Sequence, residues 1–348
     1  MLFRSRNVAF ILTLFLFILA ACGSNGSSSS ESSSPSQSNA SPSAAASASP
    51  SPSPEASPEV KTVKDVLGDV EIKGVPKRIV ALDWVYVEDV LAVGVQPVGV
   101  AEIENYNRWV KVKVDLGPDV QEVGTRFEPN LEQIAALKPD LIIGIQYRHE
   151  KIVDQLNAIA PTLIFNPYSE QAAQDPYKEM EETFLTIAEV LDKKDEGQQV
   201  LDNLNEVYAK AKEQLAASNK AGTNYVLTQA FTVQNAASFR LFTDNSIPVQ
   251  ILSKLGMTNN WKSDKLEMYG MSETTIESLP KVQDASLLTI IQSDDDVIAL
   301  HMKDNTVWKS LTFVKENRIF ALGGDTWPFG GPLSAETLTE RIVSVLSK

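Results

Sequence analysis

The sequence predicts an α/β fold of two lobes with parallel sheets, joined by one long helix. About 290 residues follow a Ser/Pro-rich N-terminal segment, which is more than one hydrophobic core usually serves. From residue 78 onward, short apolar runs alternate with helical patterns, as in parallel sheets with helices on both faces. The pattern at 130–143 recurs without a gap at 275–288, which indicates paired lobes unless two amphipathic segments are alike by chance.

The N-terminus has the features of a lipoprotein signal peptide. A basic start is followed by an apolar run at 8–19, and two alanines precede Cys22, the only cysteine of the chain. The apolar run is shorter than the roughly 20 residues that cross a bilayer. Because the segment resembles a bacterial lipobox, we expect residues 1–21 to be removed and Cys22 to carry lipid. The alternative is a cysteine that lies by chance near an ordinary cleavage site.

A tether of low complexity follows at residues 22–59. It consists almost entirely of Ser, Pro, Ala, Gly and Asn, so it cannot bury enough apolar surface to fold and should be disordered. With lipid on Cys22, this predicts a protein anchored on the extracytoplasmic face of the cell membrane, and the long Ser/Pro segment favours a Gram-positive host. The formal net charge of −14 argues against nucleic acid or anionic lipid as a partner.

The first lobe is expected to span residues 60–170. Buried strands are predicted at 78–82, 97–101, 122–124, 141–145 and 162–165, and helices at 85–92, 130–137 and 151–159.

A connecting helix is expected within residues 171–193, followed by the second lobe at 194–348. Pro176 stands near the start of a pattern in which Met180, Phe184 and Ile187 recur at helical spacing. A polar break at 193–197 precedes another helix that reaches about residue 217. The second lobe repeats the alternation, with strands predicted at 225–229, 286–291 and 318–322.

The candidate site consists of side chains that follow the predicted strands, because ligands of open parallel sheets bind beyond the carboxyl ends of the strands. In the first lobe these are Trp84, Arg108, Arg126, Tyr147, Arg148 and His149. In the second lobe they are Arg240, in a predicted loop at 239–240, and Trp327 and Phe329, in a glycine-rich loop at 323–332. Arginine donates two hydrogen bonds to carboxylate or hydroxamate oxygens, so the cluster predicts an anionic ligand. The alternative is that each arginine pairs with a surface glutamate.

Other site chemistries have little support in the sequence. No phosphate-binding glycine spacing is present, and a lone cysteine cannot form a disulfide or a thiolate metal cluster. The chain has two histidines, His149 and His301, in different predicted lobes, and the acidic run 294–296 fits a solvated turn better than a calcium site. No catalytic motif is present. We therefore expect no protein-bound metal, no cofactor and no catalytic residue, and any iron should arrive inside a chelator.

Several motifs together resemble the iron-siderophore binding lipoproteins of ABC importers, in particular the ferric citrate and citrate-hydroxamate branch. They are Arg78-Ile-Val-Ala-Leu82, Gly94-Val-Gln-Pro-Val-Gly-Val100, Val123-Gly-Thr-Arg126, the run 129–143 and Arg148-His149. The resemblance extends from about residue 61 to the end of the chain and is most specific in the first lobe. It implies a fold like class III periplasmic binding proteins, with two Rossmann-like lobes, one long helix and little closure.

The resemblance also implies roles for individual residues. Arg126 and Arg148 match the siderophore-binding arginines, and Arg108 is a looser match in a variable loop. Glu132 and Glu277 match lobe-surface glutamates that dock on arginines of the permease; the alternative is that they are solubilising charges. The implied partners are a ferric siderophore and an ABC permease with its ATPase, and the protein should be a monomer.

The final loop departs from the pattern of members that bind highly anionic citrate chelates, because residues 325–332 contain no arginine. We therefore expect a less negative ligand, such as a citrate-hydroxamate complex with a charge of about −1 by charge counting. A haem or cobalamin receptor of the same fold is the nearest alternative, and a surface hydrolase or a structural wall protein is more distant.

Overall fold

The structure is a computed structural model that describes residues 59–347. The predicted signal peptide, the lipidation site Cys22 and nearly all of the predicted tether lie outside the described residues. Within residues 59–347, no helix combines the length and the apolar character needed to cross a bilayer.

The first sheet contains five parallel strands in the order β5-β4-β3-β6-β7. Their bounds are Gln121–Glu122, Gly99–Val100, Ile79–Ala81, Leu141–Ile145 and Thr162–Phe165. Each strand overlaps a predicted one, with boundaries that differ by at most two residues, and β3, β6 and β7 are wholly buried. Strand order reverses at β3, which pairs with β4 on one side and with β6 on the other. Such a switch point, at the carboxyl ends of the strands, is where open sheets bind ligands.

Short helices connect these strands. They are α1 (Trp84–Ala92), α2 (Ile103–Trp109), α3 (Leu131–Ala136), α4 (Gln146–His149), the 3-10 turn η1 (Glu150–Ile152) and α5 (Val153–Asn157). Outside this sheet an antiparallel hairpin forms from β1 (Val60–Lys64) and β2 (Asp69–Lys73), which the sequence analysis did not predict.

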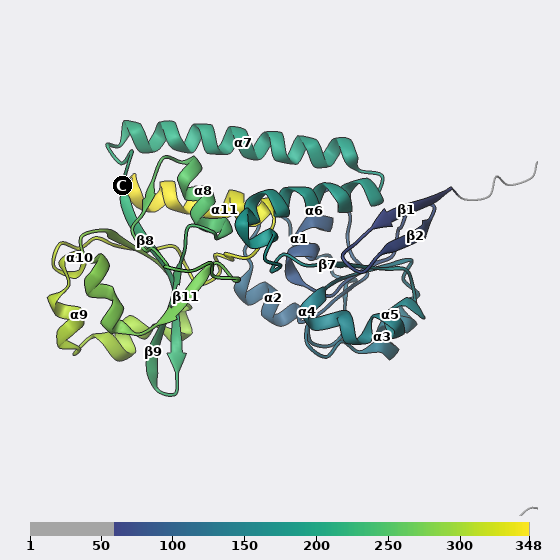
Figure 1. Cartoon of the computed structure of the whole chain (residues 1–348), viewed down its shortest axis with the longest axis horizontal. Helices are drawn as coiled ribbons and strands as arrows, with labels where there is room; N and C mark the ends of the chain where they lie inside the picture. Colours follow the sequence, from purple (N-terminus) through teal and green to yellow (C-terminus); the bar gives the residue numbers. More distant parts are fainter. Residues whose placement is uncertain (1–58, 348) are drawn as a thin grey trace, which may run out of the picture. The chain divides into compact units, whose positions relative to one another are not determined.

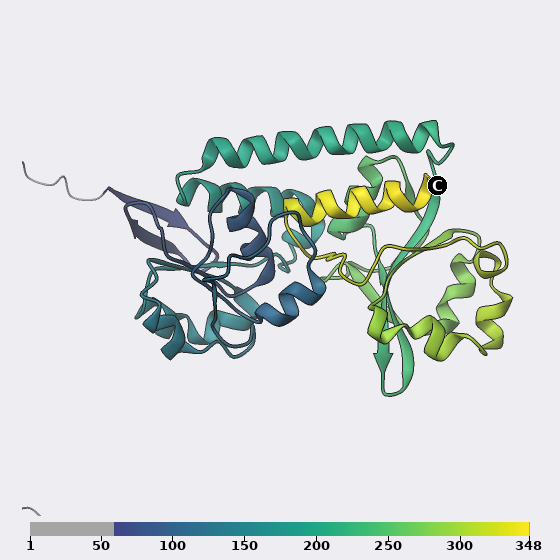
Figure 2. The ribbon, with the colours of Figure 1, turned by 180° about the vertical axis from the view of Figure 1, so that it is seen from behind.

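Two long helices follow the first sheet. After the turn η2 (Ala172–Gln174), Asp175 caps α6 (Pro176–Val190) by accepting a hydrogen bond from the Lys178 amide, and Pro176 occupies the first turn. Helix α7 (Lys194–Ala217) then runs antiparallel to α6 and extends across both sheets (Figures 1 and 2). The exact boundaries of the two lobes and of the connector stay a prediction.

The second sheet is mixed rather than purely parallel. Strands β8 (Asn224–Val233), β12 (Ser286–Ile290) and β13 (Ile319–Ala321) are parallel, as expected, and the short β10 (Thr258–Asn259) pairs with the start of β8. On the side of β8 that faces away from β12, β9 (Ala236–Phe242) and β11 (Met271–Thr274) add in antiparallel orientation.

The hairpin of β8 and β9 corrects one expectation. Arg240 was expected in a loop, but it lies within strand β9. The turn of this hairpin is formed by Gln234 and Asn235, both with positive φ, which matches the twist of two-residue hairpins.

The internal repeat corresponds to equivalent structure in the two sheets. Asn130 is the N-cap of α3, and Thr275 is the N-cap of the 3-10 helix η3 (Ile276–Val282). Each helix leads into a wholly buried strand, β6 and β12, and the two strands start eleven residues after their caps. The sequence repeat at 130–143 and 275–288 therefore corresponds to the same helix-to-strand unit in each lobe.

The remaining helices cover the second sheet and join it to the first. They are α8 (Ile247–Lys254), η4 (Ser293–Asp295), the π-helical turn η5 (Ile298–Met302), α9 (Thr306–Ser310), α10 (Thr312–Lys315) and α11 (Pro332–Leu346). Helix α11 packs against α7, α8 and α1, so it connects the two cores. At this junction the buried Glu88 of α1 accepts hydrogen bonds from the Gly331 and Ser334 amides and the Ser334 hydroxyl.

Candidate ligand-binding cleft

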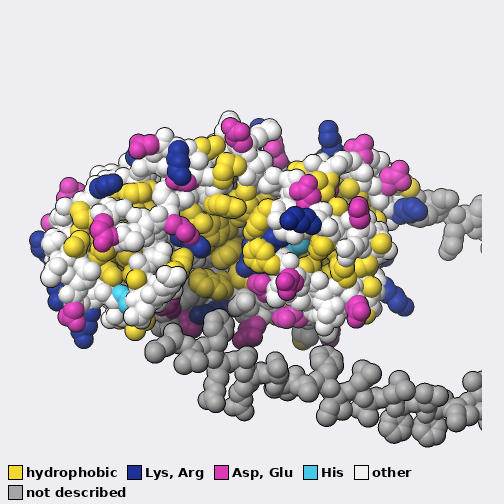
Figure 3. Space-filling view, turned by 60° about the horizontal axis from the view of Figure 1, so that its bottom comes forward, with side chains coloured by type: hydrophobic (Ala, Val, Ile, Leu, Met, Phe, Trp, Pro, Cys, Tyr) yellow, Lys and Arg dark blue, Asp and Glu magenta, His cyan; other side chains and the backbone are white. Residues whose placement is uncertain are grey.

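A cleft lies between the two sheets and has two continuous parts, with volumes of about 490 and 360 Å³. Both parts are lined by Arg126, Arg240, Trp327 and Phe329, so they form one site. Figure 3 shows hydrophobic side chains gathered in the hollow between the lobes, with basic and acidic groups around it.

Eight of the nine predicted ligand-contacting residues line this cleft. They are Trp84, Arg108, Arg126, Tyr147, Arg148, Arg240, Trp327 and Phe329. Those of the first lobe follow β3, β4, β5 and β6 at the carboxyl edge of the sheet. Trp327 and Phe329 come from the loop between β13 and α11, as the sequence predicted.

Arg126 is held by a stacked ring and a carboxylate. Its guanidinium lies 3.5 Å from the centroid of the Trp84 ring, and its Nε donates to Glu102 at 3.1 Å. Trp84 is itself fixed, because its indole N–H donates to the Ala101 carbonyl at 3.1 Å and its ring meets Trp327 edge-on. The arginine is therefore positioned at the cleft before any ligand arrives.

Arg148 forms an ion pair with Asp83 in a largely buried setting, where their side chains are 10% and 9% exposed. Its guanidinium also lies 4.6 Å from the ring centroids of both Phe127 and Tyr147. Burial raises the pKa of Tyr147 to about 12, so its phenol stays protonated and can donate a hydrogen bond to a ligand oxygen.

The other two arginines also have carboxylate partners. Arg108 binds Asp294 of η4 at 2.7 and 2.9 Å, which connects the two lobes across the cleft. Arg240 of β9 binds Glu273, its cross-strand neighbour on β11, at 2.9 Å.

All four cleft arginines are thus paired with acidic side chains. The alternative raised from the sequence is pairing with surface glutamates. Two of the partners are glutamates and two are aspartates, and they lie in or beside the cleft instead of elsewhere on the surface. The cleft is consequently close to neutral, and a ligand must compete with these pairs or accept hydrogen bonds from the remaining guanidinium N–H groups.

His149 does not line the cleft, contrary to expectation. Its side chain is 0% exposed; Nδ1 accepts from the Ile145 amide at 2.9 Å and Nε2 contacts the Arg126 carbonyl at 2.8 Å. Burial lowers the pKa of His149, so the ring is neutral, with its proton on Nε2. It supports the backbone that carries Arg126, and neither nitrogen is free to serve as an axial ligand of haem.

Three residues of the cleft wall, Tyr168, Tyr269 and Glu273, were not predicted from the sequence. A row of aromatic rings runs from Phe127 through Tyr147 and Tyr168 to Tyr269, with centroid separations of 6.5, 5.6 and 4.9 Å. Tyr168 follows β7, so inspection of that strand end would have found it. Tyr269 and Glu273 lie before and within β11, a strand that no clear pattern marks.

The two predicted docking glutamates lie away from the cleft and are both exposed. Glu132 occupies the first turn of α3, and Glu277 the first turn of η3, where it accepts a hydrogen bond from the Thr275 hydroxyl. In residues 59–347, no three His, Cys, Asp or Glu side chains are grouped so that they could hold a metal ion.

Comparison with known proteins gives consistent matches. The family model described as periplasmic binding protein matches residues 79–326. The chain is 35% identical to the Fe(3+)-citrate-binding protein YfmC of Bacillus subtilis, over 82% of this chain and 86% of that protein. It is 30% identical to the Fe(3+) dicitrate-binding periplasmic protein FecB of Escherichia coli, over 82% and 89%.

Solved structures agree with the sequence matches. The siderophore binding protein FhuD of Vibrio cholerae, crystallised with Fe3+-Desferal, is similar with a TM-score of 0.69 and 28% identity, covering 78% of this chain and 98% of that one. This similarity agrees with the expected fold class of this chain, that of class III periplasmic binding proteins. The chain belongs to the periplasmic binding protein family.

Proposed function

We propose that this protein captures a ferric siderophore outside the cell and delivers it to an ABC permease and its ATPase for iron uptake. Similar proteins are named for binding Fe(3+) citrate, and a similar solved structure holds Fe3+-Desferal. The observation that carries the proposal is the cleft itself, in which four arginines and several aromatic rings converge from both lobes.

The chemistry of the cleft suits a metal chelate better than a bare metal. Guanidinium groups donate hydrogen bonds to the oxygens of a chelator, and aromatic rings pack against its backbone. The chelator would supply all the ligands of iron, and the protein would bind the complex without covalent chemistry. We therefore assign it a binding role and no catalytic step.

The anchoring and docking parts of the proposal rest on the sequence. Lipid on Cys22 would hold the protein on the extracytoplasmic face of the membrane of a Gram-positive cell, where a monomer can meet its permease. Glu132 and Glu277 are exposed at equivalent places in the two lobes, which supports their role as paired docking points.

The charge of the cleft favours a ferric complex of low charge. Because Asp83, Glu102, Glu273 and Asp294 offset the four arginines, a multiply negative citrate chelate would meet little net attraction. A complex of two hydroxamates and one citrate α-hydroxycarboxylate, with a charge of about −1, matches the site better.

Tryptophan fluorescence tests the proposal directly, because Trp84, Trp109 and Trp327 line the cleft. The purified chain is titrated with ferric and iron-free chelators. We expect ferric schizokinen-type complexes to quench emission at lower concentration than ferric citrate, and Arg108→Ala to weaken this binding. Arg318→Ala, which removes an arginine that pairs with Glu316 outside the cleft, is the matched control. Absence of quenching by every ferric complex would reject the function, and tighter binding of ferric citrate would reject the ligand class.

A further inference from the structure

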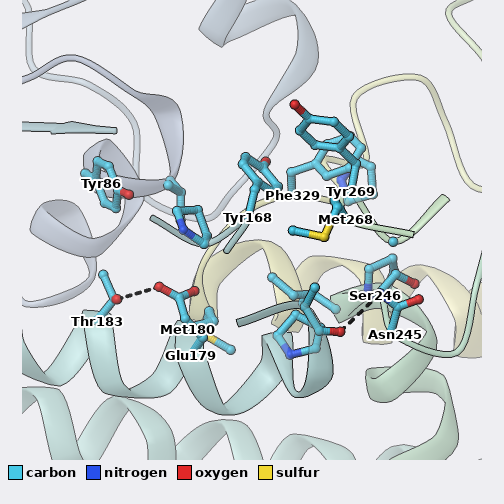
Figure 4. Close-up of a pocket in the computed structure, with 18 of the residues that line it drawn as sticks. Tyr86, Tyr168, Glu179, Met180, Thr183, Asn245, Ser246, Met268, Tyr269 and Phe329 are labelled. Carbon is cyan, nitrogen blue, oxygen red and sulfur yellow. Dashed lines mark hydrogen bonds between the residues drawn. The ribbon is translucent and has the colours of Figure 1, made fainter. Parts of the chain in front are cut away.

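A second, smaller cavity lies behind the cleft and is enclosed by α1, α6, α8 and loop segments at 167–168, 245–246, 268–270 and 328–329 (Figure 4). Its volume is about 50 Å³. Tyr168, Tyr269 and Phe329 line both this side cavity and the cleft, so these three rings separate the two spaces. A flexible part of a bound ligand would have to pass only these rings to enter it.

One end of the side cavity carries polar groups that the protein leaves without partners. Asp89 and Tyr86 of α1 are each 1% exposed, and neither Asp89 Oδ1 nor the Tyr86 hydroxyl has a hydrogen-bond partner within the described residues. Glu179 of α6 lies at the same end, and Figure 4 shows it bonded to Thr183, whose hydroxyl donates to Oε1 at 2.8 Å. Buried polar groups in native proteins nearly always have a hydrogen-bond partner, so Asp89 Oδ1 and the Tyr86 hydroxyl are expected to bind a group from outside the chain.

Within the described part of the chain, no positively charged side chain lines the cavity as a partner for these carboxyl groups. Among the residues that line the side cavity, none is Lys, Arg or His. The N-terminus of α11 lies beside Asp89, but its Gly331 and Ser334 amides donate to Glu88 instead. Burial and the negative charges of Glu88 and Glu179 raise the pKa of Asp89, and burial raises the pKa of Glu179 to about 7. Without a cation beside them the two carboxyls therefore tend to keep their protons, and a cation placed between them would favour their ionised forms.

The rest of the cavity wall is apolar. Met180, Ile247, Met268 and Phe329 surround the space between the carboxyl groups and the cleft. A volume of about 50 Å³ on this measure holds a row of three or four non-hydrogen atoms, since one water needs roughly 10–15 Å³. The shape and chemistry fit a short alkyl chain that ends in a cation.

We propose that the side cavity is a subsite for an alkylammonium arm of the captured ferric complex, with the ammonium group between Asp89 and Glu179 and the methylene chain against the apolar wall. This inference rests on the proposed function. Tyr269 is half exposed and belongs to the loop before β11, so its ring is the one that moves to admit the arm. Among the ferric complexes that the cleft can hold, those whose chelator also carries a free primary amine would gain this additional contact.

The test compares two probes that differ only at the amine. The ferric complex of desferrioxamine B ends in a primary amine, and its N-acetyl derivative ends in a neutral amide. The purified full chain should bind the amine form more tightly by about tenfold or more, as expected for a charge-assisted hydrogen bond in a buried site. Glu179→Gln and Asp89→Asn should each reduce this preference, while affinity for the acetylated complex stays unchanged.

Glu182→Gln is the matched control, because Glu182 lies on the exposed face of the same helix and pairs with Lys178. Propylammonium, with four non-hydrogen atoms, provides a second readout without iron, and it should raise the melting temperature of the native chain but not of Glu179→Gln. Equal affinity for the two ferric complexes, or a preference that survives both cavity substitutions, overturns the subsite while the cleft function stands. Failure of every ferric complex to bind, ferric citrate and schizokinen-type complexes included, with propylammonium still stabilising the chain, overturns the cleft function instead.

Discussion

The ion pair of Arg148 and Asp83 allows binding and stability to be separated. Both side chains are about nine-tenths buried, so Arg148→Met leaves the Asp83 carboxylate without its cation in a place that water hardly reaches. Breaking a buried pair in this way costs about 3–5 kcal/mol. Loss of the contacts with the Phe127 and Tyr147 rings adds roughly 0.5–1 kcal/mol each.

The double substitution Asp83→Ala with Arg148→Met should recover most of that loss. It removes the second charge as well, and replacement of a buried pair by apolar groups is often close to neutral. We expect the double variant to be more stable than Arg148→Met by about 2 kcal/mol or more, although both variants bind the ferric ligand weakly. Ligand affinity would thus depend on the presence of Arg148, and stability would depend on whether Asp83 is left without a partner.

Urea unfolding, followed by tryptophan fluorescence and far-UV circular dichroism, measures the stability of the three proteins. The free energies come from the midpoint and slope of each transition. A loss below about 1 kcal/mol in Arg148→Met, or a double variant no more stable than that single one, would refute the buried-pair reasoning. Wild-type affinity in Arg148→Met would remove this residue from the binding site.

Three further predictions concern Glu88, the docking surface and a close backbone contact. Burial raises the pKa of Glu88 from 4.5 to about 7, so the folded chain binds a proton that the unfolded chain releases, and stability should fall as the pH rises through that window. Glu88→Gln should reduce the slope by up to about 1.4 kcal/mol per pH unit in urea titrations at several pH values; an unchanged slope contradicts this. Glu132→Ala combined with Glu277→Ala should lower iron uptake by cells and leave ligand affinity intact. Glu206→Ala, on the exposed face of α7, should change neither uptake nor affinity. Equal uptake by cells with the double variant, the Glu206→Ala variant and the unaltered chain would remove the docking role. Gly324→Ala should lower the free energy of unfolding by about 1–3 kcal/mol, because the added Cβ would lie 2.5 Å from the Gln292 Cα. Gly117→Ala, whose added Cβ would have its nearest neighbour at 3.4 Å, should leave the stability nearly unchanged; thermal unfolding of the two variants measures the difference.

The first sheet was predictable because its signals are local. Buried strands of four or five apolar residues, such as Leu141–Ile145 and Thr162–Phe165, are recognisable without knowledge of their neighbours. Arg126 and Arg148 were found by the same means, since they follow strands and parallel strands end at one edge. His149 also follows a strand but does not reach the cleft. Its ring turns inward, where it bonds to the Ile145 amide and the Arg126 carbonyl, and these partners are known only from the folded structure.

The sequence by itself determined the alternation of strands and helices, the repeat that relates α3 to η3, and the set of arginines that line the cleft. Only the tertiary structure decided how those charges are balanced. Arg108 and Asp294 are 186 residues apart, Arg148 and Asp83 are 65 apart, and Arg240 meets Glu273 only because β9 and β11 pair in one register. The side cavity likewise depends on α1, α6 and α8 closing around Asp89. Periodicity and composition act along the chain, whereas pairing, burial and cavities arise between segments that packing brings together.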